Sequence, residues 1–346
     1  MMPMAAFRPR AEVRPPWGRA LVTGGAGFLG SPLCARLLDS GVEVDCLDNL
    51  SIGRAEKVAH LAGRHGFRFL EGDIRDPGRV DALTGPYDLV LHLAGPGSPA
   101  AWPDRPVANL DTGGLGTRTA LAVAARDGAR FLLASSPPLL PTGPPLDALP
   151  AEHAITAGPA GPHSARAEAV RFCEALVTAH VGAHGTNAGI VRLFAGYGPG
   201  MRTDDGGTPA AFIQQALAGR PVTVAGDGSR TYPLCYVDDM VDGVLLVAAG
   251  RSVRPVDLGG DEEPTAVEIA RRVIDVSGSD SPLVFADGTD DRPVEPRPVT
   301  GFAREIFGWL PSVTWQDGLE RTVASLRERP GPVQAAATGR AGEWWA

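Results

Sequence analysis

The sequence is poor in lysine, in cysteine and in long apolar stretches. Lys57 is the only lysine among 32 basic residues, a bias that GC-rich coding explains. The four cysteines have no paired spacing, which disfavours disulfides and metal sites and predicts buried thiols in a reducing compartment: Cys34, Cys46, Cys173 and Cys235. No apolar run reaches the length of a membrane span, and the start lacks the apolar core of a secretory signal. We therefore expect a cytoplasmic protein with no bound metal and no membrane partner.

The charge balance is acidic. The 346 residues carry a formal net charge of −8 at pH 7. A nucleic-acid-binding surface needs a basic face to neutralise phosphates, so this balance argues against a nucleic-acid partner. Hydrophobic residues make up 44% of the chain and charged residues 21%, which is typical of a globular protein. The length allows one large domain or two unequal ones.

Short apolar runs alternate with helical stretches along the first part of the chain. Strands are predicted at 20–22, 42–47, 67–70, 88–93, 131–134 and 189–193, and the first helix at 28–38. This alternation is typical of βαβ units, in which a parallel sheet carries helices on both faces. After about residue 197 it loosens, and further helices are predicted near 237–249, 264–276 and 315–328. The pattern predicts an α/β fold, a Rossmann-type doubly wound parallel sheet with a smaller C-terminal substrate lobe.

The same patterns give expected boundaries. A flexible arm is predicted over 1–17, which is rich in proline and arginine, and a flexible tail over 330–346. The Rossmann domain is predicted over 18–195, with parts of 222–260 contributing to it. Residues 196–329 would then form mainly the substrate-binding lobe.

A glycine-rich turn joins the first predicted strand to the first predicted helix. In such a turn Gly24 allows the tight bend, Gly27 lets the backbone approach a pyrophosphate, and Gly30 lets the helix pack closely on the strand. The second strand ends at Asp48, 18 residues beyond Gly30. A carboxylate there accepts hydrogen bonds from both ribose hydroxyls and repels a 2′-phosphate, so the pattern predicts NAD rather than NADP.

Two later turns extend this predicted cofactor site. An aspartate after the third strand can reach the adenine amino group, and small residues after the fourth strand let the backbone lie along the cofactor. Together the predicted cofactor-binding residues are Gly24, Gly27, Phe28, Leu29, Gly30, Asp48, Asn49, Asp73, Ile74, Leu93, Ala94 and Gly95.

Several segments in the same order resemble a known family. They include the run from Leu21 to Asn49, His92-Leu93-Ala94-Gly95, Tyr197-Gly198-Pro199, Cys235-Tyr236-Val237-Asp238-Asp239 and Phe307-Gly308-Trp309. Over about residues 19–328 the chain resembles the extended short-chain dehydrogenases/reductases of the NAD-dependent epimerase/dehydratase family, and most closely the UDP-glucuronate decarboxylases (UDP-xylose synthases). The resemblance implies a Rossmann fold, NAD as cofactor and a nucleotide sugar as substrate.

The resemblance also implies a particular chemistry. In this family NAD transiently oxidises the C4 hydroxyl of the sugar, a tyrosine acts as acid and base, and a lysine four residues later lowers the tyrosine pKa. No tyrosine occurs between Tyr87 and Tyr197, and the single lysine lies far upstream, so the chain has no Tyr-x-x-x-Lys. An ungapped match counted back from Phe194 places Arg166 and Val170 at these two positions.

Other family positions also differ. Counting forward from Ser136 places Ala165, instead of Arg166, at the tyrosine position, and neither residue is a tyrosine. The active-site and nucleotide-contacting residues implied by the resemblance correspond to unlike residues here: Gly113, Pro138, Ala195, Tyr232 and Pro296. The substrate half is therefore rewritten, whereas the cofactor half is kept.

Four residues are candidates for an altered catalytic role: Ser136, His163, Arg166 and Glu168. Ser136 stands where the family has a serine or threonine, and His163 would titrate near neutrality. Arg166 cannot act as a base, but its permanent charge can hold a carboxylate or stabilise an oxyanion. Each of these side chains could instead be solvated or cap a surface helix.

Two functions remain open. The first is an atypical NAD-dependent enzyme of a biosynthetic pathway that modifies a nucleotide sugar as an epimerase, dehydratase or decarboxylase does, with non-standard catalytic residues. The second is a catalytically silent NAD-binding homologue that acts as a partner or regulator. Retention of the glycine turn and Asp48 favours the first, whereas the missing pair argues against ordinary UDP-glucuronate decarboxylation. The resemblance also implies a homodimer, with the helices around 105–126 and 163–180 at a four-helix interface.

Overall fold

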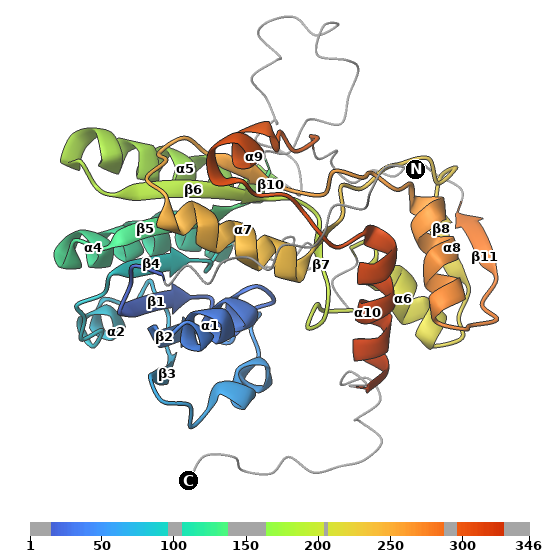
Figure 1. Ribbon diagram of the computed structural model, residues 1–346, viewed down its shortest axis with the longest axis horizontal. Coiled ribbons are helices and arrows are strands. Elements are labelled where there is room, and N and C mark those ends of the chain that lie inside the picture. The colour runs from blue at the N-terminus through green and yellow to red at the C-terminus, as the bar shows by residue number, and fades with distance from the viewer. Residues whose placement is uncertain (1–14, 96–105, 138–163, 204–206, 287–295, 329–346) are drawn as a thin grey trace, which may run out of the picture.

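The computed structural model describes residues 15–95, 106–137, 164–203, 207–286 and 296–328 (Figure 1). Most of the predicted arm and the whole predicted tail lie outside these residues. Trp17, which the sequence analysis placed in the arm, is buried against the core. The ordered core therefore begins before the boundary predicted at residue 18.

Seven parallel strands form the main sheet, in the order β10-β6-β5-β4-β1-β2-β3. Their bounds are β1 Arg19–Thr23, β2 Glu43–Asp48, β3 Phe67–Glu71, β4 Leu89–His92, β5 Arg130–Ser135, β6 Ala188–Leu193 and β10 Val256–Leu258. The six strands predicted from the first part of the chain are confirmed. The strand order reverses between β1 and β4, and open α/β sheets bind ligands outside the carboxyl ends of the strands at such a point.

Helices cover both faces of this sheet, as the alternating pattern predicted. On one face α1 (Gly30–Asp39) and α7 (Val237–Ala249) pack over a core that includes Leu33, Val44 and Val244. On the other face α4 (Thr117–Asp127) and α5 (Ser164–His184) cover a second core that includes Leu121 and Ile190. The first helix begins at Gly30 instead of residue 28, because Phe28 and Leu29 still belong to the turn.

The shorter elements connect these layers. Helix α3 (Pro106–Asp111) runs through a π turn, Thr112–Gly116, directly into α4. Among the described residues, the remaining connections contain two 3₁₀ turns and two short helices, whose bounds are Ala55–Lys57, Ala59–Leu61, α2 Pro77–Asp81 and α9 Gly301–Phe307. A two-stranded parallel ladder joins β7 (Gly196–Tyr197) to β9 (Cys235–Tyr236).

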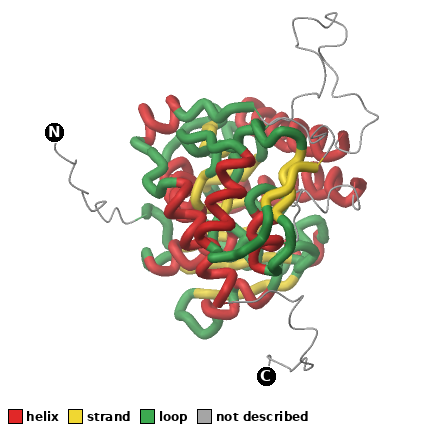
Figure 2. Tube along the Cα trace, turned by 90° about the vertical axis from the view of Figure 1, so that its right-hand side faces the viewer, coloured by secondary structure: helices red, strands yellow, loops and turns green. Residues whose placement is uncertain are grey.

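A smaller lobe lies beside the sheet, to its right in Figure 1 and nearest the viewer in Figure 2. It contains α6 Ala210–Leu217, β8 Val222–Ala225, α8 Ala266–Val276, β11 Leu283–Ala286 and α10 Trp315–Glu328. Strands β8 and β11 pair in parallel. Helix α8 begins with a capping box, because the Thr265 hydroxyl accepts from the Glu268 backbone N–H and the Glu268 carboxylate accepts from that of Thr265.

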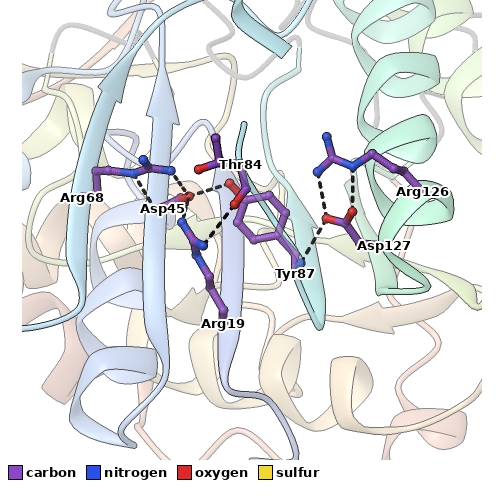
Figure 3. Close-up of polar contacts among 7 residues, drawn as sticks. All are labelled: Arg19, Asp45, Arg68, Thr84, Tyr87, Arg126 and Asp127. Atoms are coloured by element: carbon purple, nitrogen blue, oxygen red, sulfur yellow. Dashed lines mark hydrogen bonds and ion pairs between the residues drawn. The ribbon is translucent and has the colours of Figure 1, made fainter. Parts of the chain in front are cut away.

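A polar cluster lies near the amino ends of the strands (Figure 3). The buried Asp45 carboxylate of β2 accepts hydrogen bonds from Arg19 at 2.9 Å and from Arg68 at 3.0 and 2.6 Å. The Tyr87 hydroxyl also donates to Asp45, and the Arg19 guanidinium lies 5.2 Å from the centre of the Tyr87 ring. This cluster ties β1, β3 and the start of β4 to β2.

All four cysteines are buried and free, as predicted. Within the described ranges, no helix is both long and apolar enough to cross a membrane. Those ranges also contain no group of three or more histidine, cysteine, aspartate or glutamate side chains that could hold a metal ion.

Candidate functional site

A cavity of about 980 Å³ lies at the carboxyl edge of the main sheet. Its walls come from the ends of β1, β2, β4 and β5, from α5, and from the residue ranges 207–210 and 229–233 beside the smaller lobe. All twelve predicted cofactor-binding residues line it. The structure therefore brings the separate turns of the sequence together at one edge, at the point where the strand order reverses.

Two positions of the glycine turn require glycine, because the surrounding backbone leaves no room for a side chain. Gly24 has a φ of +71°, and a Cβ there would lie 2.8 Å from the Ala94 backbone nitrogen. A Cβ on Gly30 would collide with the carbonyl oxygen of Gly24 and with Gly25. The turn can therefore bring backbone N–H groups and the start of α1 to the cavity wall.

Asp48 ends β2 at the same edge. The residue is 7% exposed, and its carboxylate accepts hydrogen bonds from the backbone N–H groups of Ala26 at 3.0 Å and Leu50 at 2.8 Å. Burial raises the pKa of Asp48, and these two hydrogen bonds partly oppose that rise. A carboxylate has about four acceptor positions. This geometry can therefore accept further hydrogen bonds from two ribose hydroxyls.

Asp73 is held differently. Arg75 donates to it through its backbone N–H at 2.8 Å and through its guanidinium at 2.9 and 2.7 Å, and the Asn49 amide donates at 2.9 Å. The Arg75 hydrogen bonds lower the pKa of Asp73 to about 2, so Asp73 is ionised at neutral pH. Arg75 also lines the cavity, although the sequence analysis did not select it.

The four catalytic candidates do not all lie at the cavity. Ser136 and the buried Arg166 line the cavity, and so does Val170, one helical turn beyond Arg166 on α5. Glu168 is exposed, pairs with Arg171 at 3.7 Å and does not line the cavity. Glu168 lies on a different side of the helix from Arg166 because two residues along a helix turn a side chain by about 200°. His163 lies outside the described residues.

A polar network behind Ser136 fixes helix α5 to the sheet. The Glu174 carboxylate accepts from the Ser135 hydroxyl at 2.7 Å and from the Arg192 guanidinium at 2.9 and 2.6 Å. Glu174 lies two turns beyond Arg166 on α5, while Ser135 ends β5 and Arg192 belongs to β6. These bonds restrict how α5 can rotate, and so restrict where the Arg166 side chain enters the cavity.

The rest of the cavity is rich in cationic side chains that the sequence analysis did not select: Lys57, Arg75, Arg202, Arg230 and Arg297. Arg202, Arg230 and Arg297 come from the C-terminal part of the chain. With Arg166 they face a cavity whose two lining acids, over the described residues, are Asp48 and Asp73. This concentration of positive charge, in a chain of net charge −8, suits an anionic ligand.

Residues 20–259 match the sequence model of the NAD dependent epimerase/dehydratase family. UDP-glucuronic acid decarboxylase 1 of Xenopus tropicalis is 33% identical over 310 residues, which cover 90% of this chain and 72% of that protein. This similarity agrees with the resemblance found in the motifs.

Solved structures show the same fold. UDP-glucose 4-epimerase of Thermotoga maritima, determined with UDP-glucose, has a TM-score of 0.77 and 25% identity, covering 90% of this chain and 99% of that one. The dTDP-glucose 4,6-dehydratase of Streptomyces venezuelae, with NAD and TYD bound, has a TM-score of 0.75 and 27% identity, covering 90% and 98%. The chain therefore belongs to the NAD-dependent epimerase/dehydratase family.

Proposed function

We propose that this protein is an NAD-dependent enzyme that modifies a nucleotide sugar with non-standard catalytic residues. The observation that carries the proposal is the single cavity that holds every predicted cofactor residue together with Ser136 and Arg166. We also propose a cytoplasmic location, which the four free, buried cysteines support because such thiols persist in a reducing compartment.

The residues at the cofactor end fit NAD. Gly24 and Gly30 allow the close-packed turn that brings the start of α1 to the cavity, and Asp48 keeps acceptor capacity for a ribose diol. The buried Asp48 carboxylate would oppose a 2′-phosphate. When bound, NAD supplies a hydride acceptor or donor.

Arg166 would stabilise negative charge on the substrate at the other end of the cavity. Oxidation of a sugar carbinol would send a hydride from the carbon to bound NAD and the hydroxyl proton to solvent, so negative charge would develop on the oxygen as its proton leaves. A buried guanidinium favours that oxyanion, or holds an anionic group of the substrate, without gaining or losing a proton itself. The Ser136 hydroxyl can donate a hydrogen bond to the same oxygen.

The test compares two arginines of α5. We expect Arg166→Ala to lower turnover of the productive nucleotide sugar by about 10² to 10³, the usual loss when one oxyanion donor is removed. Arg171→Ala is the matched control, because Arg171 is exposed on the same helix and pairs with Glu168. Turnover would be followed as NADH absorbance and product mass across a panel of nucleotide sugars. Full activity of Arg166→Ala would remove Arg166 from the mechanism, and rapid UDP-xylose formation from UDP-glucuronate would contradict the altered chemistry.

The second candidate function is a catalytically silent NAD-binding protein that acts as a partner or regulator. Val170 favours it, because a buried valine lines the cavity where the family's lysine is expected and can neither move a proton nor hold a ribose hydroxyl. This candidate predicts NAD binding with no turnover of any nucleotide sugar. Measured turnover that depends on NAD would exclude it.

A homodimer is proposed through α3, the π turn and α5. Large apolar side chains are exposed there: Val107, Leu110, Leu115 and Phe172. Gly114 of the π turn lies against the Phe172 ring, and both α3 and the π turn pack on α5, so the elements that carry these side chains are neighbours. We expect light scattering to give a dimer mass for the wild type and a monomer mass for Phe172→Glu. A monomeric wild-type chain would contradict this assembly.

A further inference from the structure

Lys57 is the only lysine of the chain, and it lies in the wall of the cavity. It ends the 3₁₀ turn Ala55–Lys57, in the connection between β2 and β3, and it is half-buried. Gly27 of the glycine turn and Asp48 belong to the same wall. The single lysine of the chain therefore stands at the end of the cavity where the dinucleotide is proposed to bind.

Backbone hydrogen bonds fix Lys57 against the glycine turn and the start of α1. Its carbonyl oxygen accepts from the hydroxyl of Ser31, in the first turn of α1, at 2.6 Å. Its N–H donates to the Arg54 carbonyl oxygen at 3.0 Å, and the Arg54 N–H donates to the Ala26 carbonyl oxygen at 3.1 Å. Because these bonds use the backbone of Lys57, a substitution of its side chain should leave the segment in place.

The positive charge of Lys57 acts on the Asp48 carboxylate. Burial raises the pKa of Asp48, and hydrogen bonds from Leu50 and Ala26 and then the charge of Lys57 oppose that rise. The two charges are therefore close enough to interact. A dinucleotide also carries negative charge on its pyrophosphate, which an ionised Asp48 repels. A cation at this position offsets that repulsion.

The other acid at this end of the cavity already has a cationic partner. The Arg75 guanidinium donates to both carboxylate oxygens of Asp73. Arginine has a rigid fork that suits such a carboxylate, whereas lysine is a compact point charge on a flexible stem that also serves to bind phosphate. Lys57 can therefore attract a phosphate while Asp48 keeps acceptor positions for ribose hydroxyls.

We propose that Lys57 binds the pyrophosphate of the dinucleotide and holds its negative charge beside the Asp48 carboxylate. The proposal rests on the NAD binding proposed above, and it adds a cationic contact to the glycine turn. It assigns the charge of Lys57 to the pyrophosphate that NAD and NADP share, and not to the 2′-phosphate that NADP alone carries.

The first test is calorimetric titration of the full-length protein with NAD at low ionic strength. Methionine keeps the length of the side chain and removes its charge, so we expect Lys57→Met to bind NAD about tenfold more weakly, the lower end for a hydrogen bond to a charged group. Lys57→Arg keeps the charge and should bind nearly as tightly as the wild type. Wild-type affinity of Lys57→Met, or an equal loss in Lys57→Arg, overturns the proposal.

Arg64→Met is the matched control for the lost charge. Arg64 belongs to the same connection between β2 and β3, pairs with Asp39 at 2.7 Å and does not line the cavity. This variant should bind NAD as the wild type does. A loss as large as that of Lys57→Met would mean that any cation of this connection attracts the dinucleotide from a distance, and it too overturns the contact.

The second test repeats Lys57→Met in the Asp48→Asn protein. A pyrophosphate contact predicts that the affinities for NAD and for NADP fall by the same factor, again about tenfold, because both dinucleotides carry this group. No further loss in this background would mean that Lys57 acts only by way of Asp48. A larger loss for NADP than for NAD would place the ammonium group at the 2′-phosphate. Either result overturns the proposal.

The single lysine also allows the contact to be observed directly. Reductive methylation with ¹³C-formaldehyde labels the Lys57 amine and the terminal amine and keeps their charges, and Lys57→Arg identifies the Lys57 NMR signal. We expect NAD and ADP to shift this signal, because both carry the pyrophosphate, and adenosine to leave it in place. A signal that NAD does not move overturns the proposal.

These experiments distinguish failure of the proposed function from failure of this proposal. A wild-type chain that binds no NAD contradicts the proposed function itself. A wild type that binds NAD no more tightly than Lys57→Met does contradicts the role of Lys57 alone.

Discussion

Two aspartates of the same strand show how the two edges of the sheet differ. Asp45 lies three residues before Asp48 on β2, and both carboxylates are buried. Asp45 accepts from two guanidinium groups and a phenol, whereas Asp48 accepts from two backbone N–H groups. Burial opposes ionisation of both. Hydrogen bonds from Arg68 and Tyr87 outweigh it at Asp45 and lower that pKa, while the pKa of Asp48 is raised.

These different partners distinguish a carboxylate that stabilises the fold, Asp45, from one that can bind a ligand, Asp48. Asp45 is surrounded by charged partners that tie neighbouring strands together, and it does not line the cavity. Asp48 lines the cavity and keeps acceptor capacity toward it. A buried acid is therefore a binding candidate where its remaining lone pairs face an open space.

The largest expected effect is the loss of the Asp45 cluster. Asp45→Ala leaves Arg19, Arg68 and the Tyr87 hydroxyl without their shared acceptor, and we expect the free energy of unfolding to fall by about 3–5 kcal/mol. NAD affinity of the folded fraction stays at the wild-type value. Chemical denaturation and calorimetry measure the two quantities. The control is Asp39→Ala, which removes an exposed pair with Arg64 worth about 1 kcal/mol or less. An Asp45→Ala protein as stable as the wild type would refute the structural role.

The next largest effect is expected from a substitution in the glycine turn, at the carboxyl edge of the sheet. A methyl group at Gly30 collides with the backbone of Gly24 and Gly25, so Gly30→Ala should cost about 1–3 kcal/mol of stability. Because the displaced backbone also forms the cavity wall, NAD affinity falls as well. The control is Gly182→Ala on α5, where a Cβ meets no atom within 4 Å and stability should be unchanged or slightly higher. Unaltered NAD binding by Gly30→Ala would contradict the close approach.

These effects also show what the sequence could predict. The glycine turn, the first helix and Asp48 could be predicted because they are near neighbours in the chain, and each has a local pattern. The Asp45 cluster could not, because it depends on the register of β1 and β3 against β2. Likewise Arg202 and Arg230 reach the cavity through packing of the smaller lobe, and no spacing in the sequence indicates that.

A further effect concerns NAD affinity at Asp48. Asp48→Asn keeps the size of the side chain but loses the charge and one acceptor, so NAD affinity should fall about tenfold to a hundredfold, equivalent to about 1.5–3 kcal/mol. Discrimination against NADP should weaken in the same variant, because the repelling charge is gone. Glu43→Gln, at the exposed start of the same strand, is the control for both titrations. Equal affinity of Asp48→Asn and the wild type for NAD would show that Asp48 does not contact the ribose.

The smallest effect is the pH dependence of stability. The folded-state pKa of Asp45 lies below its ordinary value, so its ionised form stabilises the fold above about pH 4, and that contribution is lost as the pH falls through the folded-state pKa. Asp45→Asn should therefore flatten the acid limb of the stability curve. Urea titrations of both proteins between neutral and acid pH measure it. An acid limb of unchanged slope would mean that other carboxylates dominate.

The central claim is that the cofactor end of the cavity still holds NAD although the Tyr-Lys pair is absent. Its most direct test is to denature the purified full-length protein, after incubation with NAD and NADP together and removal of free nucleotide, and to identify the released nucleotide by mass spectrometry. We expect NAD or NADH in near-stoichiometric amount from the wild type and far less from Asp48→Asn. Release of NADP, or of no dinucleotide at all, would contradict it.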